Sequence, residues 1–323
     1  MIHTRSHVAP VTRNAGMPLD QSWVEETVIN RSAVERRAAT LGGRRTVKKA
    51  WQAAWLLRAV ECIDLTTLSG DDTESNVHRL CAKAKQPVRQ DLLDALGVGP
   101  IRTGAVCVYH NYVEACVKNL AGSGIPVAAV STGFPAGLSP FRERIHEIKA
   151  SVQSGASEID IVITRAHVLN QDWQALYDEM QQFREACGEA HVKAILATGE
   201  LGTLSNVARA SLVCMMAGAD FIKTSTGKES VNATIPFGLV MCRMIRDYED
   251  RTGFKVGFKP AGGIRTAKQS LDFLTLMREE LGPRWQQPDL FRIGASTLLS
   301  DIERQLEHYL TGQYSAYNRH PMA

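Results

Sequence analysis

Eight short apolar segments alternate with amphipathic segments from about residue 60 to residue 310, and this alternation constrains the fold more than any other feature. Alternating strands and helices are typical of a parallel sheet covered by helices. The strands are predicted at 60–64, 105–109, 127–130, 158–163, 192–197, 221–224, 255–259 and 290–293. Eight such units over roughly 250 residues favour a closed (β/α)8 TIM barrel. No Gly-x-Gly-x-x-Gly follows the first strand, which argues against an open dinucleotide-binding sheet.

The predicted helices occupy the intervals between these strands, and further segments flank the barrel at both ends. The helices are expected at 73–85, 111–121, 141–154, 173–187, 204–217, 236–251, 267–281 and 297–310. We assign residues 46–311 to the barrel and residues 312–323 to a C-terminal tail. Residues 1–45 are expected to form a short helical N-terminal extension, with a helix near 19–40 and a partly disordered start.

The junction between the extension and the barrel carries four basic residues in six, in the segment 44–49. Such a run resembles a nuclear-import patch. However, Trp51, Trp55 and Leu56 follow at helical spacing. This pattern favours a solvated stretch ahead of a helix that packs its apolar side chains against the barrel.

The composition argues against several classes of protein. A hydrophobic content of 44% with 22% charged residues is ordinary for a globular chain. No run of about eighteen apolar residues occurs, so no membrane span is expected. The net charge of +3 is small, which argues against a nucleic-acid partner. The seven cysteines form an odd set without Cys-x-x-Cys spacing, which predicts reduced thiols in a cytoplasmic protein.

Two lysines, Lys223 and Lys259, each end a predicted buried strand and are followed by small or glycine-bearing loop residues. A single lysine at such a place is most often a strand-end residue whose ammonium reaches solvent. Two lysines on neighbouring strands of a barrel face each other, and each lowers the pKa of the other. The pair therefore predicts one neutral amine that forms an imine with a carbonyl substrate, beside a second amine that stays charged.

Acidic residues are predicted in the same barrel. Asp64 ends the first predicted strand, and Asp160 lies within 158–163, where alternation directs Glu158, Asp160 and Val162 to one face. A carboxylate inside the barrel needs a cationic partner, which Lys223 or Lys259 can supply. Asp160 is then either part of a structural ion pair or a group that moves protons during carbon–carbon bond cleavage.

The loops after the last two strands suggest a phosphate site. Gly262 and Gly263 follow the seventh strand, and Gly294 and Ser296 follow the eighth. Each loop leads into a helix, and glycine-rich loops at helix starts present free N–H groups to anions. The nine histidines show no metal-binding spacing, so no metal site is expected.

The chain resembles the deoxyribose-phosphate aldolases, which are class I aldolases on a (β/α)8 barrel. The similarity covers about residues 63–300. The segments that carry it are Ile63-Asp-Leu-Thr-Thr-Leu68, Ala105-Val-Cys-Val-Tyr109, Glu158-Ile-Asp160, Thr198-Gly-Glu-Leu201, Phe221-Ile-Lys-Thr-Ser-Thr-Gly-Lys228, Val231-Asn-Ala-Thr234, Gly257-Phe-Lys-Pro-Ala-Gly-Gly263 and Gly294-Ala-Ser296.

This resemblance implies reversible cleavage of 2-deoxy-D-ribose 5-phosphate to acetaldehyde and D-glyceraldehyde 3-phosphate, without a cofactor. It implies Lys223 as the Schiff-base lysine, Lys259 as its pKa-perturbing partner and Asp160 as proton donor and acceptor. The partners implied are the phosphorylated sugar and the aldehydes, and a homo-oligomer is compatible with the sequence. The positions that match substrate hydroxyl and phosphate contacts are Asp64, Thr66, Gly227, Lys228, Gly263, Gly294 and Ser296.

Two other functions stay open at the level of sequence. Another class I aldolase or a transaldolase would keep the imine lysine and change the donor. An inactive barrel would act as a scaffold, binding RNA or a partner through its basic N-terminal region. In addition, the resemblance to some family members offers a C-terminal tyrosine, Tyr314 or Tyr317, as a residue that the tail brings over the strand ends.

Overall fold

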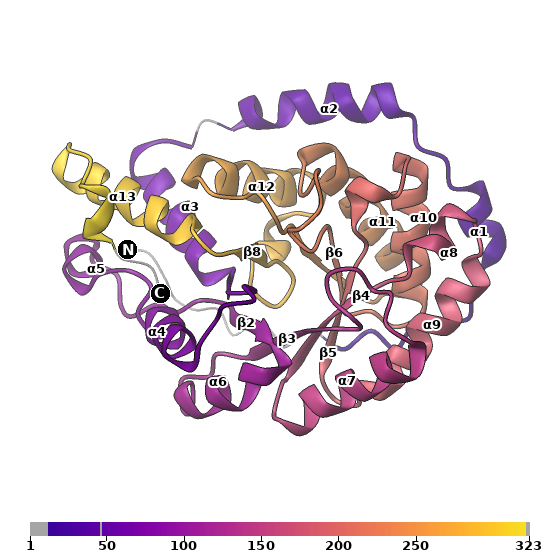
Figure 1. The fold of residues 1–323 in the computed structure, drawn as a ribbon. Coiled ribbons are helices and arrows are strands. Elements are labelled where there is room, and N and C mark those ends of the chain that lie inside the picture. The colour runs from indigo at the N-terminus through magenta and orange to yellow at the C-terminus, as the bar shows by residue number, and fades with distance from the viewer. Residues whose placement is uncertain (1–11, 46, 321–323) are drawn as a thin grey trace.

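Eight parallel strands form a barrel in the computed structural model, which describes residues 12–45 and 47–320 (Figure 1). Neighbouring strands follow chain order from β1 to β7, and β8 pairs with β1. Isolated parallel bridges from Phe258 to Phe291 and from Ala261 to Gly294 join the two remaining edges. The predicted (β/α)8 fold is therefore confirmed.

The strands and helices have the following bounds. The strands are β1 (Ile63–Thr66), β2 (Ala105–Tyr109), β3 (Val127–Ser131), β4 (Glu158–Val162), β5 (His191–Ile195), β6 (Phe221–Lys223), β7 (Gly257–Lys259) and β8 (Ile293–Ala295). The helices are α1 (Gln21–Glu26), α2 (Arg31–Arg44), α3 (Lys49–Glu61), α4 (Glu74–Lys85), α5 (Gln90–Leu96), α6 (Val113–Asn119), α7 (Phe141–Gln153), α8 (Arg165–Leu169), α9 (Trp173–Ala186), α10 (Leu204–Met216), α11 (Ile235–Thr252), α12 (Ala267–Glu280) and α13 (Leu298–Thr311).

Most predicted boundaries agree with these to within one or two residues, but the first and last strands are shifted. Strand β1 starts at Ile63 rather than residue 60, because α3 continues through Glu61. Strand β8 starts at Ile293 rather than residue 290, because residues 287–291 form a turn with backbone bonds to Gln287. The helix predicted near 19–40 is two helices, and Asn30 caps the second by accepting from Ala33 N–H. Helices α5 and α8 were not predicted.

Alternation along β4 separates the two packing environments of the barrel. Ile159 and Ile161 belong to the large apolar core between strands and helices, as predicted. Val162 belongs instead to a small apolar cluster formed mainly by residues from four consecutive strands, β2 to β5. Glu158 and Asp160 share the face of Val162, so both carboxylates point into the barrel.

The N-terminal extension packs on the outside of the barrel. Asn14 is buried, and its side-chain amide donates to the carbonyl oxygens of Met215 (2.7 Å) and Ala219 (2.9 Å). Trp23 in α1 stacks on Tyr248 of α11, with ring centroids 6.4 Å apart. Helix α2 lies along the outer side of the molecule beside α11 and α12 (Figure 1). Residues 1–11, expected to be disordered, lie outside the described part of the chain.

The C-terminal tail packs against α13. The Tyr314 ring stacks on His308 with centroids 4.1 Å apart and is 58% exposed, so this tyrosine is held by α13 rather than over the strand ends. His320 is buried, with Nε2 2.8 Å from Glu307 Oε2. The Tyr317 side chain lies outside the described part of the structure. Within the described ranges, no helix is long and apolar enough to cross a membrane.

Candidate active site

Asp160 lies among buried charged side chains inside the barrel. Its Oδ2 atom accepts hydrogen bonds from Lys223 Nζ and from Lys259 Nζ, each at 2.7 Å. The two lysines are register partners on β6 and β7, while Asp160 comes from β4. All three side chains are buried. The structure therefore brings together the three residues that the sequence singled out for chemistry.

Asp64 and Lys193 extend this group to β1 and β5. Lys259 Nζ lies 2.5 Å from Asp64 Oδ2, so this lysine contacts two carboxylates. Lys193 Nζ donates to the other oxygen of Asp160 at 3.0 Å and to Glu158 Oε2 at 2.5 Å. Lys223, in contrast, has an ion pair only with Asp160 among the described residues.

Arg292, the residue before β8, connects the carboxylates of Asp64 and Glu158. Its Nη1 donates to Asp64 Oδ1 at 2.6 Å, and its Nη2 donates to Glu158 Oε1 at 2.8 Å. Both carboxylates are thereby held from the side opposite the lysines. We call the seven connected residues the buried ionic cluster: Asp64, Glu158, Asp160, Lys193, Lys223, Lys259 and Arg292.

The charges of the buried ionic cluster do not balance when every member is ionised. Four cations face three carboxylates, which leaves one positive charge in excess. Excess charge in a buried environment is costly, and the usual response is that one group becomes neutral. Lys223 is the cation with the least compensation, because it shares its single carboxylate with Lys259 and Lys193. Loss of its proton would leave three cations opposite three carboxylates.

The pKa shifts within the buried ionic cluster agree with an excess of one positive charge. Burial lowers the pKa of Lys223, and the charge of Lys259 acts in the same direction against the opposing effect of Asp160. Burial also disfavours the charged form of Lys259, but Asp160 and Asp64 outweigh it, so the pKa of Lys259 is raised. For Asp160, burial is outweighed by Lys193, Lys223 and Lys259, which hold its pKa well below the usual range. The amines of Lys223 and Lys259 are thus driven in opposite directions.

The small apolar cluster lies beside Lys223 in the strand register. Ile195 is the register partner of Lys223 on β5, and Val162 is the partner of Ile195 on β4. Phe134, from the loop after β3, packs edge-on against Tyr109 with centroids 5.8 Å apart. The other members are Cys107, Ala128 and Val130, with Leu68 at the edge. The register neighbours of Lys223 are therefore a charged residue on β7, Lys259, and an apolar residue on β5, Ile195.

Thr66 and Lys228 lie at the mouth of the barrel. The Thr66 hydroxyl donates to the backbone oxygen of Asp64 at 2.7 Å. Lys228 is exposed, and its Nζ donates to Leu68 O at 3.2 Å, which links the loop after β6 to the loop after β1. Its charge therefore lies over the opening rather than inside the barrel.

The four glycines expected around phosphate differ in whether their N–H groups are free. Gly227 N–H donates to Glu229 Oε2 at 3.1 Å, and Gly294 N–H donates to Pro260 O at 2.9 Å. These two glycines therefore shape the loops, and their N–H groups are engaged within the described part of the chain.

Gly262 and Gly263 have free backbone N–H groups among the described residues. Their φ angles are +84° and +79°, in the left-handed region that glycine tolerates, and neither N–H has a partner among the hydrogen bonds of the described residues. A Cβ at Gly262 would lie 2.6 Å from Asn232 Oδ1, so glycine is required there. Ser296 is exposed and lies just before α13. Gly262, Gly263, Ser296 and the start of α13 are thus the positions where donors remain available among the described residues.

Sequence reasoning missed Lys193 and Arg292 and gave no role to Glu158. Each is a charged residue inside a short apolar run, and that pattern would have identified them as buried charges.

Three buried polar atoms within the quoted motifs also lack a hydrogen-bond partner in the described part of the chain: Thr198 Oγ1, Ser225 Oγ and Asn232 Oδ1. A substrate hydroxyl would satisfy such atoms, since unpaired buried polar atoms are costly.

Comparisons with known proteins point to one family. The family model described as "DeoC/LacD family aldolase" matches residues 58–299. The chain is 62% identical to "Deoxyribose-phosphate aldolase" of Homo sapiens, over 96% of this chain and 99% of the relative. It is 63% identical to the Mus musculus protein of the same name, over 95% and 98%. The solved structure of deoxyribose phosphate aldolase from Aeropyrum pernix shares the fold, with a TM-score of 0.60 at 21% identity, and covers 86% of this chain and 99% of that one.

The family match extends from the end of α3 to the start of α13, which includes every strand of the barrel. The identity to the mammalian relatives runs through nearly the whole chain, including the N-terminal extension. The resemblance noted in the sequence motifs is thereby confirmed. The chain belongs to the DeoC/LacD family of aldolases and, within it, to the deoxyribose-phosphate aldolases, which makes it a carbon–carbon lyase.

Proposed function

We propose that the chain reversibly cleaves 2-deoxy-D-ribose 5-phosphate to acetaldehyde and D-glyceraldehyde 3-phosphate through a Schiff base on Lys223. The observation that carries the proposal is the state of the Lys223 amine. It is buried, its pKa is lowered, and it is the cation of the buried ionic cluster with the least carboxylate compensation. A neutral amine in such a place is a nucleophile for an aldehyde carbon.

The first half of the reaction forms the imine. The neutral Lys223 nitrogen attacks C1 of the open-chain sugar, and the C1 oxygen takes a proton to give a carbinolamine. A second proton on that hydroxyl allows it to leave as water, and a positively charged imine remains. Lys259 supplies this acid, because its pKa is raised and it stays charged. Asp160 Oδ2 contacts both amines at 2.7 Å, so it can pass a proton between them.

The second half breaks the carbon–carbon bond. Asp160 accepts the proton of the C3 hydroxyl, and the C2–C3 electron pair then moves toward the imine nitrogen. D-glyceraldehyde 3-phosphate departs, and the two-carbon fragment stays on Lys223 as an enamine. Protonation at C2 and addition of water then release acetaldehyde and restore the amine. In the synthetic direction the same steps run in reverse.

The apolar cluster favours an aldol donor substrate that has no hydroxyl on the carbon next to its carbonyl group. Ile195 lies at the register position beside Lys223, and Val162 lies beside Ile195. Neither side chain can hydrogen-bond a hydroxyl, so a dihydroxyacetone donor would bury an unpaired polar group there. The methyl carbon of acetaldehyde fits this wall. This contrast separates the proposal from a transaldolase or another class I aldolase, which would transfer a hydroxylated donor.

The phosphate of the sugar would lie at the loops after β7 and β8. The available donors are the N–H of Gly263, the N–H and hydroxyl of Ser296, and the first turn of α13. Helix starts carry a partial positive charge that favours a phosphate. Exposed Lys228 would add charge at the barrel mouth. We place the activity in deoxyribose phosphate catabolism in the cytoplasm, consistent with the seven unpaired cysteines.

Borohydride trapping tests the proposal directly. Reduction in the presence of acetaldehyde should add an ethyl group to Lys223, identified by peptide mass spectrometry, and Lys223→Met should abolish the labelling. Labelling of Lys259 or Lys193 in the wild-type protein would assign the imine to another amine. Parallel assays with acetaldehyde and dihydroxyacetone as donors test the proposed donor specificity. Faster turnover with dihydroxyacetone would contradict the preference for acetaldehyde.

A further inference from the structure

Trp51 is 74% exposed on the first turn of α3, although its spacing predicted a buried helix face. Trp55 lies one turn further along the same side of the helix and is partly buried. Neither indole nitrogen has a hydrogen-bond partner among the described residues, and no cation lies over either ring. Two neighbouring indoles at one surface form an aromatic patch, and tryptophan is enriched where proteins bind partners.

The two tryptophans line a cavity of about 590 Å³ on the surface between α2, α3 and α12. Its other lining residues come from the end of α2, the α2–α3 linker, α12 and the turn after it: Arg44, Arg45, Val47, Arg278 and Gln286. A cavity of this size is large enough to hold a nucleotide-sized group. Among the described residues, the wall is therefore built mainly from aromatic rings and guanidinium groups, with one aliphatic side chain, Val47, and one amide, Gln286.

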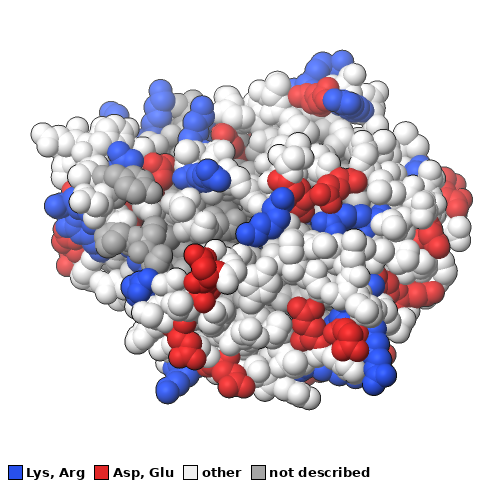
Figure 2. Space-filling view, in the orientation of Figure 1, with Lys and Arg blue, Asp and Glu red and all other residues white. Residues whose placement is uncertain are grey.

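Most positive charges around this cavity lack a carboxylate partner. Arg45 is paired, with Nε 2.6 Å from Glu279 Oε1. Arg44 Nε contacts only the Thr40 hydroxyl at 3.3 Å, and Arg278 and exposed Lys48 have no ion pair within the described ranges. In Figure 2, blue side chains gather at the upper left, where Figure 1 places the α2–α3 linker. Unpaired cations beside an open indole suit a ligand with both phosphates and flat rings.

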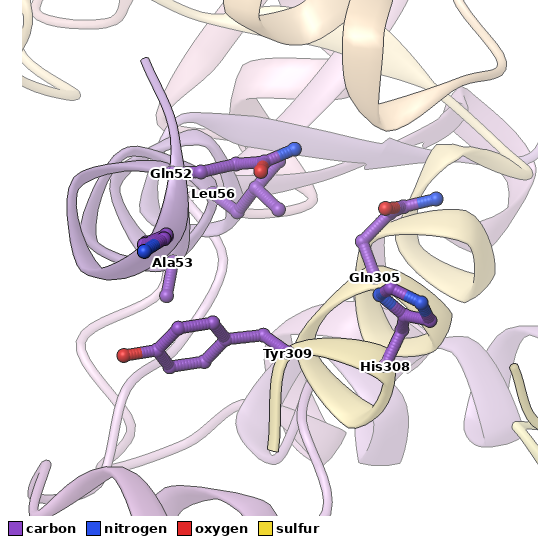
Figure 3. Close-up of a pocket in the computed structure, with 7 residues that line it drawn as sticks. Gln52, Ala53, Leu56, Gln305, His308 and Tyr309 are labelled. Atoms are coloured by element: carbon purple, nitrogen blue, oxygen red, sulfur yellow. The ribbon is translucent and has the colours of Figure 1, made fainter. Parts of the chain in front are cut away.

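A second cavity of about 250 Å³ lies on the other side of α3, between α3 and α13 (Figure 3). Lys49, Gln52, His308 and Tyr309 are among its lining residues. Val47 lines the larger cavity and Lys49 lines the smaller one, so the intervening Lys48 lies between the two. The basic and aromatic residues thus extend over the start of α3 as a continuous track, which we call the α2–α3 track: Arg44, Arg45, Lys48, Lys49, Trp51, Trp55 and Arg278.

We propose that the α2–α3 track binds single-stranded nucleic acid. Unpaired bases would stack on Trp51, and successive phosphates would contact Arg44, Lys48 and Arg278. An extended strand fits better than a free mononucleotide, because the cations continue from one cavity toward the other. A duplex fits less well, since its bases are stacked on each other and unavailable to the indole. The net charge of +3 argued against a nucleic-acid partner only because it averages over the whole surface.

Fluorescence anisotropy with labelled single strands of about 12 nucleotides, in DNA and RNA forms, tests this site on the full-length protein. Raising salt from about 50 to 200 mM should weaken binding about 20-fold if three phosphates are contacted. Trp51→Leu should weaken binding by about 5- to 100-fold through lost stacking. Arg44→Glu with Arg278→Glu should weaken binding strongly and flatten the salt dependence.

Arg142→Glu, a charge reversal at an exposed position of α7, is the matched control and should bind like the wild type. Aldolase turnover should be unchanged in all variants, which verifies that they are folded. Three results would overturn the proposal: no saturable binding by the wild type, equal weakening by Arg142→Glu, or competition by a mononucleotide as effective as that by the strand. Sedimentation provides a further check, because a dimer that Trp51→Leu dissociates would identify the track as a contact between copies of the chain.

Discussion

Lys223 and Lys259 bind the same oxygen atom, Asp160 Oδ2, at 2.7 Å each. Their nitrogens therefore lie within twice that distance of each other, although the residues are 36 positions apart in the chain. Lys259 has a second carboxylate partner in Asp64, and Lys223 has none beyond Asp160 among the described ion pairs. This asymmetry gives two identical side chains opposite pKa shifts, and it is the physical basis of the roles proposed for them.

Lys223→Met should reduce aldol cleavage by about 10⁴-fold or more, because methionine fills the same space without a nucleophile. The measurement is turnover of deoxyribose 5-phosphate in a coupled assay. The melting temperature should stay near the wild-type value, since three cations and three carboxylates remain in the buried ionic cluster. Residual turnover within tenfold of the wild type would show that Lys223 is not the nucleophile.

Lys259→Leu should raise the pKa of Lys223, because a neighbouring positive charge is lost while both carboxylates stay. Imine formation would then require a higher pH, and the rate near pH 7 would fall. The observable is the pH dependence of borohydride trapping with acetaldehyde, whose midpoint should move upward by about one pH unit or more. A midpoint unchanged from wild type would mean that the two amines do not interact.

Glu158→Gln and Arg292→Gln should shift the pH midpoint of borohydride trapping in opposite directions, although neither residue contacts Lys223. Removal of the Glu158 charge increases the positive excess of the buried ionic cluster and lowers the pKa of Lys223. Removal of the Arg292 charge does the reverse, and each shift should be about one pH unit. Because Arg292→Gln leaves buried carboxylates unpaired, circular dichroism must first show that this variant is folded. Shifts of the same sign in both variants would argue against charge balance as the cause.

Ser296→Asp should remove most of the preference for phosphorylated over free deoxyribose, because a carboxylate would repel phosphate at the start of α13. Charge-assisted hydrogen bonds to phosphate contribute about 1.5–3 kcal/mol each, so two of them correspond to roughly 10²- to 10⁴-fold in kcat/KM. Ser296→Ala is the matched control and should lose only the hydroxyl contact. Imine formation with acetaldehyde should be unaffected in both. An unaltered preference in Ser296→Asp would place the phosphate elsewhere.

Stability should fall in acid because of the buried carboxylates. The pKa values of Asp64, Glu158 and Asp160 are lowered in the folded protein, since nearby cations outweigh the effect of burial. Their contribution to stability is therefore complete above the unfolded-state values of about 4 and is lost as the pH falls below them. Thermal unfolding measured from pH 7 to pH 3 should show a steep fall in Tm below about pH 4.5. A flat profile over that range would contradict the ion pairs.

The sequence by itself determined the architecture and the lysine pair that we propose for catalysis. Alternating strand and helix patterns specified eight βα units, because side-chain periodicity is a local property of the chain. Lys223, Lys259 and Asp160 could be identified because each places a charge on an apolar strand, and burial of an isolated charge is too costly to be incidental. The predicted start of β1 and the predicted single N-terminal helix were less accurate. The ends of helices depend on capping residues such as Asn30, which compete along the chain.

Only the tertiary structure decided which charges meet and which donors are free. Arg292 pairs with Glu158, 134 positions away, and sequence distance carries no information about such contacts. The N–H of Gly227 is taken by Glu229, and that of Gly294 by Pro260, although both glycines occur in loops typical of phosphate binding. Trp51 followed a helical pattern but faces solvent, because periodicity locates an apolar face without showing what covers it. Charge balance, free donors and exposed rings are properties of packed neighbours, and packing joins strands that the chain order keeps apart.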